Sequence, residues 1–152
     1  MIEQIYTYFT IEMLYYWINL GVLPFWLALI FFPQSYFCRY FVTSIFPIFI
    51  LSGAYMFVLY KAYLNAYPFD NNFNLYMGMN NISELFSDKF FLLMFWTHFI
   101  CINLFTGGWI VKDSQKFAIN KLLMIFPLLI TYLIGPLGLF IYWLIRIFHA
   151  KS

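Results

Sequence analysis

His98 is the one ionisable side chain that the sequence places well inside an apolar segment. The same segment holds Trp96, Asn103 and Trp109, and Asp113 follows about one helical turn further on. A titratable group at membrane depth is costly unless it faces other helices, a cavity or a ligand. A neutral histidine can pass a proton as a general acid or base. We therefore predict His98 and Asn103 as catalytic residues, with the amide of Asn103 orienting an oxygen atom.

A wider set of residues is predicted to bind a lipophilic ligand. His98, Asn103 and Asn19, together with tyrosine hydroxyls, would line a cavity between kinked helices. The alternative is structural: His98 and Asn103 would be interhelical hydrogen-bonding groups, worth about 0.6–2 kcal/mol each. Asp113 has the alternative role of capping a loop or pairing with Lys112 or Lys116. The predicted ligand-binding residues are Asn19, Trp26, Trp96, Trp109 and Asp113.

The composition is that of a membrane protein. Hydrophobic residues make up 64% of the chain and charged residues only 9%, with a mean hydropathy of +0.82. A soluble domain of this length needs far more charge to cover its surface. The net charge of +2 is small and scattered, which argues against a nucleic-acid partner.

Four apolar segments are each long enough for a membrane-spanning helix of about 20 residues. Because backbone groups in lipid must be paired internally and these segments exceed barrel strands, helices are the expected structure. We predict an all-α membrane protein, a single domain over residues 1–152 that forms a bundle of four transmembrane helices. Pro24 predicts a kink in the first helix, and Gly135-Pro136 a break in the fourth. The predicted spans are Met13–Cys38, Tyr40–Tyr60, Phe90–Val111 and Leu122–Ile145.

The only long connection joins the second and third predicted spans, from about Tyr63 to Lys89. Its part Leu75–Phe86 mixes apolar and polar residues, which predicts a short amphipathic helix at the interface or over the bundle mouth. Ser87 or Asp88 is expected to cap the third span.

Four spans would place the N-terminus, the long connection and the C-terminus on one side of the membrane. Lysines and arginines then divide four against four, so that their count leaves the orientation open. The cluster Lys112–Lys121 favours a cytoplasmic position for its short loop. No cleavable leader is expected, since the N-terminus carries no Lys or Arg. We expect a multi-pass protein of a bacterial cytoplasmic membrane.

Metal and cofactor chemistry are not predicted. Bis-histidine haem needs two ligands at matching depth, whereas His98 and His149 would differ by roughly 10 Å along the membrane normal. The carboxylates all fall outside the predicted spans, which disfavours a non-haem iron site. Cys38 and Cys101 form no CxxC pattern and are interpreted as apolar side chains.

Four stretches of the sequence stand out together: Asn19-Leu20-Gly21-Val22-Leu23-Pro24-Phe25-Trp26, Trp96-Thr97-His98, Asn103-Leu104-Phe105-Thr106-Gly107-Gly108-Trp109 and Gly135-Pro136-Leu137-Gly138. Their ordered spacing resembles the abscisic-acid-deficient-four-like family, which includes plant neoxanthin synthase, over nearly the whole chain. The resemblance implies a carotenoid- or isoprenoid-related membrane function. Plant members are required for the redox-neutral isomerisation of violaxanthin to neoxanthin. His98 corresponds to the family's histidine in helix three, and Asn103 stands where the family usually has aspartate.

Three functions are compatible with the sequence. The first is an isoprenoid-modifying enzyme, such as a carotenoid epoxide isomerase. The second is a non-catalytic protein that binds a pigment or lipid. The third is a small subunit of a larger membrane complex or a homo-oligomer, with Ser52-Gly53-Ala54 and Gly107-Gly108 as contact faces. Membrane lipids and a lipophilic ligand are the expected partners.

Overall fold

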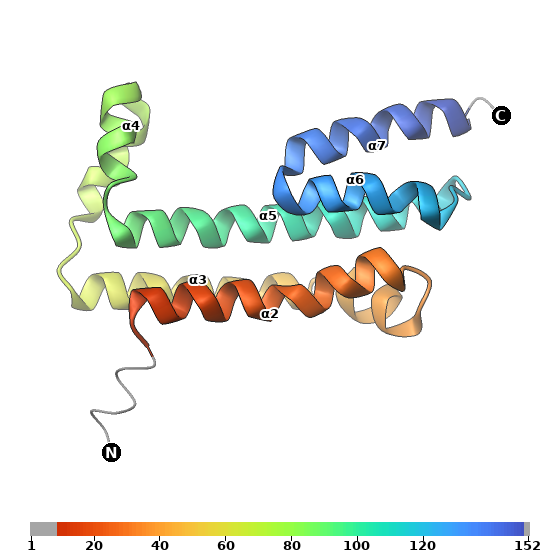
Figure 1. Cartoon of the computed structure of the whole chain (residues 1–152). Helices are drawn as coiled ribbons and strands as arrows, with labels where there is room; N and C mark the ends of the chain where they lie inside the picture. The colour runs from red at the N-terminus through yellow and green to blue at the C-terminus, as the bar shows by residue number, and fades with distance from the viewer. Residues whose placement is uncertain (1–8, 151–152) are drawn as a thin grey trace, which may run out of the picture. The chain divides into compact units, whose positions relative to one another are not determined.

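The computed structural model describes residues 9–150, and these residues form helices and loops without a strand. Within this part of the chain, three helices are long and apolar enough to cross a membrane. They are α2 (Ile11–Phe31), α3 (Phe46–Leu64) and α5 (Lys89–Lys116) (Figure 1). The prediction of an all-α protein with several apolar helices is confirmed.

The chain folds into two compact units. Unit 1 holds the described residues up to Leu20 together with Leu51–Phe99, and unit 2 holds Gly21–Ile50 and the described residues from Ile100 onward. Each long helix therefore has one end in each unit: α2 and α5 begin in unit 1, and α3 begins in unit 2.

Polar side chains fix where the helices begin. The carboxylate of Asp88 accepts hydrogen bonds from the backbone N–H groups of Phe90 and Phe91, at 2.8 and 2.9 Å. Such a cap satisfies amide groups that the first helical turn leaves unpaired. Asp88 is thus the cap of α5, as predicted. Thr10 accepts from the N–H of Met13 in the same way at the start of α2.

The predicted start of the second span at Tyr40 is wrong. A short π-helix, η1 (Cys38–Val42), occupies this position, and α3 begins only at Phe46. The hydroxyl of Ser44 donates a hydrogen bond to the carbonyl of Phe41 at 2.6 Å and accepts one from the N–H of Phe46 at 3.1 Å. Serine competes with helical pairing in this way, so the chain turns before α3 although its apolar sequence continues.

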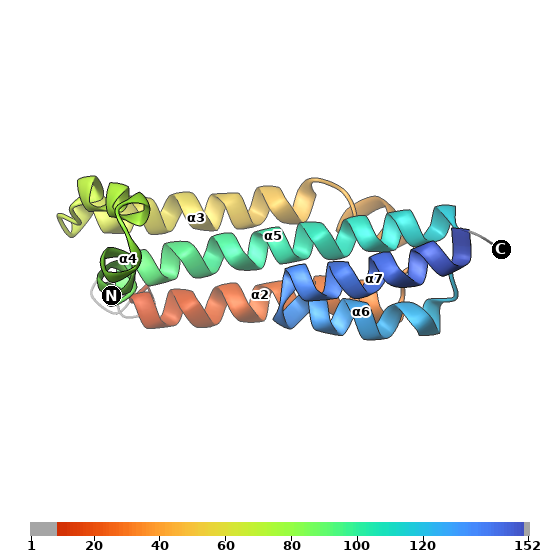
Figure 2. The same cartoon turned by 90° about the horizontal axis from the view of Figure 1, so that it is seen from above.

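The predicted single fourth helix over Leu122–Ile145 is also wrong. The segment forms two shorter helices, α6 (Lys121–Leu133) and α7 (Gly135–Ala150), which lie side by side (Figures 1 and 2). Pro136 has no backbone N–H, so the carbonyl of Tyr132 loses the partner that a continuous helix would supply. The break itself is predicted at Gly135-Pro136, but the reversal of the chain is not.

Helix α7 returns alongside the second half of α5. Its first residue, Gly135, lies against the side chain of Asn103, and its Arg146 forms an ion pair with Asp113. Because Asn103 and Asp113 follow one another along α5, α7 runs parallel to it. Both ends of the α6–α7 hairpin therefore lie at the Lys116 end of α5.

In unit 1, the connection between α3 and α5 is helical in two pieces. These are the 3-10 helix η2 (Phe69–Tyr76) and α4 (Met79–Leu85), which contact each other. Gly78 joins them with a φ of 129°, a conformation that side-chain-bearing residues rarely adopt. The single short helix predicted over Leu75–Phe86 is thus divided at this glycine.

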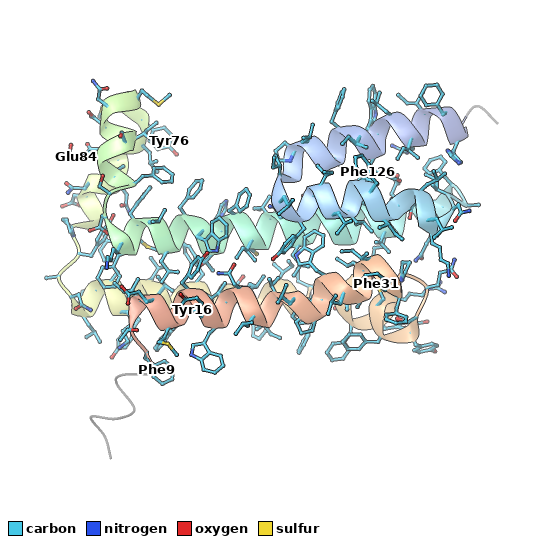
Figure 3. The ribbon with its side chains drawn as sticks, viewed as in Figure 1. Phe9, Tyr16, Phe31, Tyr76, Glu84 and Phe126 are labelled. Carbon is cyan, nitrogen blue, oxygen red and sulfur yellow. The ribbon has the colours of Figure 1, made fainter. Side chains whose placement is uncertain are left out.

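Large apolar side chains cover much of the outer surface. Tyr16, Phe31 and Phe126, labelled in Figure 3, are each more than half exposed. Soluble monomers rarely expose so many large apolar residues. Such a surface suits contact with lipid.

Candidate functional site

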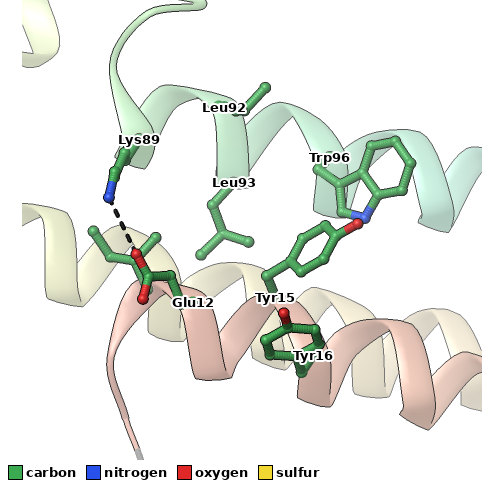
Figure 4. A pocket seen from close by; sticks show the side chains of 8 residues that line it. Glu12, Tyr15, Tyr16, Lys89, Leu92, Leu93 and Trp96 are labelled. Atoms are coloured by element: carbon green, nitrogen blue, oxygen red, sulfur yellow. Dashed lines mark hydrogen bonds and ion pairs between the residues drawn. The ribbon is translucent and has the colours of Figure 1, made fainter.

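A groove of about 450 Å³ lies in unit 1 between the first turns of α2 and the first turns of α5 (Figure 4). Its walls are mostly apolar and aromatic, and its polar groups are few. Sites for lipophilic ligands have this character, with a small number of polar groups fixing orientation. We call it the Trp96 groove; it is lined by Ile11, Glu12, Tyr15, Tyr16, Lys89, Leu92, Leu93 and Trp96.

Two residues predicted to bind ligand meet beside this groove. The indole Nε1 of Trp96 donates a hydrogen bond of 3.3 Å to the Oδ1 of Asn19. Asn19 in turn donates from its Nδ2 to the backbone carbonyl of Tyr15 at 2.7 Å. The ring of Tyr15 lies 5.9 Å from that of Trp96, between centroids. The amide of Asn19 therefore helps to hold the aromatic wall in place, and both its oxygen and its nitrogen already take part in hydrogen bonds.

Glu12 and Lys89 line the same groove and are not among the predicted site residues. Their side chains form an ion pair of 3.1 Å (Figure 4). Both side chains are more than 70% exposed, so that solvent weakens the attraction and the pair contributes little stability. One signal in the sequence could have identified them: each is a charged residue directly before a predicted span, and the first and third spans begin on the same side.

His98 does not face the Trp96 groove. It is exposed, and at 100° per residue it lies about 200° around α5 from Trp96. The expected cavity lined jointly by His98 and Asn19 is therefore absent from the described part of unit 1. The catalytic role of His98 stays a prediction.

Asn103 is 4% exposed and belongs to unit 2. Its Nδ2 is the buried side-chain nitrogen without a hydrogen-bond partner in the described part of the chain. A Cβ added to Gly135 would overlap the amide oxygen of Asn103. Glycine at this position therefore allows the break between α6 and α7 to pack against the Asn103 side chain. A buried donor left unpaired costs about 1–3 kcal/mol. The free donor is thus available to an oxygen atom that enters the site.

Trp26 lies in the core of unit 2. Its ring fills the space that Gly107 leaves, since a Cβ there would lie 2.8 Å from the indole. Tyr132 packs edge-on against the same ring at 5.3 Å. The expectation that Gly107 offers a face to another protein is therefore wrong, because Trp26 of the same chain covers it. Gly53 has no atom within 4 Å of an added Cβ in this structure.

Asp113 pairs with residues of α7 rather than with the expected Lys112 or Lys116. Its Oδ2 accepts from the hydroxyl of Tyr142 at 2.7 Å and lies 3.0 Å from the Nε of Arg146. Trp109 packs edge-on against the ring of Tyr142 at 5.9 Å. Asp113 and Tyr142 are both buried. The cluster joins α5 to α7 and leaves little of Asp113 accessible to a ligand.

The cysteines are free thiols. Cys38 is fully buried in η1, and burial raises the pKa of its thiol to about 11. Since the thiolate is the nucleophile, Cys38 is poorly suited to covalent chemistry at neutral pH. The described residues contain no group of three or more His, Cys, Asp or Glu side chains placed to hold a metal ion.

A family model described as ABA DEFICIENT 4-like matches residues 13–142. The chain belongs to this family. The matched region contains all the predicted site residues and the whole of α6, but it ends at Tyr142 within α7. No curated protein and no solved structure gives a significant match. The ABA DEFICIENT 4-like match therefore confirms the resemblance on which the carotenoid hypothesis rests.

Proposed function

We propose that this ABA DEFICIENT 4-like protein binds an oxygenated isoprenoid of the carotenoid class, with one end group in the Trp96 groove. The observation that carries the proposal is the groove itself. Its aromatic wall suits a ring and the first conjugated bonds of a polyene, and its length from Lys89 to Trp96 is roughly 10 Å. The Glu12–Lys89 pair would hydrogen-bond an oxygen on the ring.

Asn103 is a separate polar position in unit 2, with an unpaired donor for an oxygen atom. A neutral amide can donate a hydrogen bond to a hydroxyl, epoxide or carbonyl oxygen, but it cannot serve as a general acid near pH 7. This chemistry favours binding and orientation of the ligand over proton transfer at Asn103.

Redox-neutral isomerisation of an epoxide is the second candidate function. It is favoured by the position of Glu12 and Lys89 at the groove, where a carboxylate and an ammonium group lie 3.1 Å apart. Isomerisation of an epoxide needs a proton donor at the oxygen and a base that removes a carbon-bound proton. Lys89 and Glu12 have these two characters, whereas His98 lies on the opposite face of α5.

The ligand proposal predicts that Trp96→Leu loses a bound isoprenoid. The variant removes the aromatic wall and the hydrogen bond to Asn19. The gently purified protein is extracted with solvent, and absorbance and mass spectrometry identify the extract. We expect the wild type to carry a stoichiometric isoprenoid and Trp96→Leu to retain less than about a tenth of it, as expected when stacking worth about 1–3 kcal/mol is lost.

Trp17→Leu is the matched control, since Trp17 lies on α2 in the same unit but is 56% exposed and does not line the groove. It should retain the isoprenoid. Equal loss in both variants, or a wild type that carries only phospholipid, contradicts binding in the groove. If incubation with the protein converts the ligand into a compound of the same mass but a different absorbance spectrum, the result would favour the isomerase function.

We further propose that α2, α3 and α5 cross the membrane and that α6–α7 enters and leaves it from one side. At 1.5 Å per residue, α6 and α7 are about 20 and 24 Å long, shorter than the hydrocarbon core of about 30 Å. Among the described residues, unit 2 then holds five basic side chains and unit 1 only Lys61 and Lys89. The excess favours a cytoplasmic position for the polar ends of unit 2. The five are Arg39, Lys112, Lys116, Lys121 and Arg146.

This topology predicts opposite reporter signals from the C-terminus and the α3–α5 connection. A fluorescent protein that folds only in the cytoplasm should be bright after Ser152 and dark after Tyr76. Alkaline phosphatase, active only outside the cytoplasm, should give the reverse. Four full spans predict the same signal at both positions, so matching signals would contradict the re-entrant hairpin.

A further inference from the structure

A second cavity, of about 580 Å³, lies in unit 2 where three segments of the chain end or begin. Its lining is rich in polar groups, with two cations, three amide side chains and no carboxylate. We call it the basic hollow; it is lined by Gln34, Arg39, Gln115, Ala118, Ile119, Asn120 and Lys121.

Hydrogen bonds hold the walls of the basic hollow. Gln115, near the end of α5, donates from its Nε2 to the carbonyl of Pro33 at 2.9 Å and so ties α5 to the segment after α2. Asn120 caps α6, because its Oδ1 accepts from the N–H of Leu122 at 3.0 Å. The amide side chains of Gln115 and Asn120 are therefore held in place by the fold, which lowers the entropy lost when an anion binds.

The charge of the hollow is uncompensated within unit 2. Asp113 is the one described carboxylate of that unit, and Arg146 and Tyr142 already engage it. Arg39 and Lys121 thus have no carboxylate partner there. The N-terminus of α6 adds the positive end of a helix dipole at Lys121. An anion of the size of a phosphate group would meet two cations and several N–H donors at once.

The position of the hollow indicates where such a phosphate comes from. It lies beyond the ends of the apolar helices α2 and α5, and strongly exposed apolar side chains flank it in the sequence, including Phe32 and Leu122. A phospholipid presents this combination, with a charged headgroup next to apolar chains. We infer that the basic hollow binds the phosphodiester headgroup of an anionic phospholipid. This site is separate from the Trp96 groove, and its test does not depend on the isoprenoid proposal.

The test titrates the full-length protein in neutral detergent with phosphatidylglycerol and, separately, phosphatidylcholine, and native mass spectrometry counts the bound lipid. Neutral detergent removes the charged bilayer surface, so that only a local site distinguishes the two lipids. We expect the wild type to prefer phosphatidylglycerol. The double variant Arg39→Gln/Lys121→Gln should weaken that binding by about ten-fold or more, because it removes both charges that face the headgroup.

Lys112→Gln/Lys116→Gln is the matched control, since it removes the same charge from the same unit without altering the lining of the hollow. It should weaken phosphatidylglycerol binding by less than about three-fold. Equal loss in the two double variants, or equal binding of the two lipids by the wild type, overturns the proposal. Inorganic phosphate at millimolar concentration separates the sources of the anion: full displacement of the lipid would assign the hollow to soluble phosphate and overturn the lipid assignment.

Discussion

Asp113→Ala is expected to lower the free energy of unfolding by about 3 kcal/mol. The substitution leaves the hydroxyl of Tyr142, which is fully buried, without its acceptor, and it leaves Arg146 without its carboxylate. An unpaired buried donor costs about 1–3 kcal/mol, and loss of one partner of a buried ion pair costs about 3–5 kcal/mol. The expected loss of about 3 kcal/mol is below the sum of these costs, because the Arg146 side chain is one-third exposed and can turn to water. Unfolding in mixed micelles with increasing SDS, followed by circular dichroism, measures the difference.

Glu12→Ala is the control for that measurement, because it breaks an ion pair on the surface of the protein. The Glu12 and Lys89 side chains are exposed, so its removal should change the free energy of unfolding by less than about 1 kcal/mol. Similar losses of unfolding free energy in Asp113→Ala and Glu12→Ala would contradict the prediction that the buried Asp113 interactions stabilise the protein more than the exposed ion pair. Tyr142→Phe combined with Asp113→Ala should cost less than the sum of the single changes, since both remove the same hydrogen bond.

Much of the helical framework could be predicted because it depends on local chemistry. Apolar length determines the long helices, and the carboxylate of Asp88 caps the helix that follows it. These features depend on residue type and spacing alone.

The α6–α7 hairpin could not be predicted in the same way. Pro136 indicates a break, but a kinked spanning helix and a reversed hairpin carry the same proline and the same hydropathy. Tertiary contacts decide between them. Gly138 allows α7 to pack closely against Thr131 of α6, and Arg146 forms an ion pair with Asp113 of α5. The division of lysines and arginines between the two sides depends on this choice, so the sequence alone leaves the orientation open.

The Trp96 groove escapes prediction for a related reason. Glu12 and Lys89 are far apart in the chain, and only their positions at the starts of two spans that begin on the same side relate them. The exposure of His98 is not predicted from the sequence, because the prediction assumes that a polar group in a span must face inward. The helix rotation that directs Trp96 toward α2 directs His98 away, and that rotation follows from packing rather than from the apolar character of α5.

Gly138→Ala is expected to destabilise the protein by about 3 kcal/mol through the α6–α7 contact. A Cβ at this position would overlap the Oγ1 and the backbone nitrogen of Thr131 and would lie 2.6 Å from its Cα. Overpacking costs about 1–3 kcal/mol, and the upper end applies where backbone atoms must move. Gly53→Ala is the control, because an added Cβ there meets no atom within 4 Å. Alanine favours a helix over glycine, so this change should stabilise the protein by up to about 1 kcal/mol.

A second substitution separates side-chain overlap from backbone overlap. Thr131→Ala removes the hydroxyl that the new methyl group at position 138 would meet, but it leaves the backbone of α6 where it was. It should therefore rescue little of the stability lost in Gly138→Ala. At Gly135 the three atoms nearest to an added Cβ all belong to the side chain of Asn103, so Asn103→Ala should rescue most of the stability lost in Gly135→Ala. Full rescue at both glycines would mean that α6 and α7 can move apart, and the hairpin would then not be the tightly packed element that holds the helix break against Asn103.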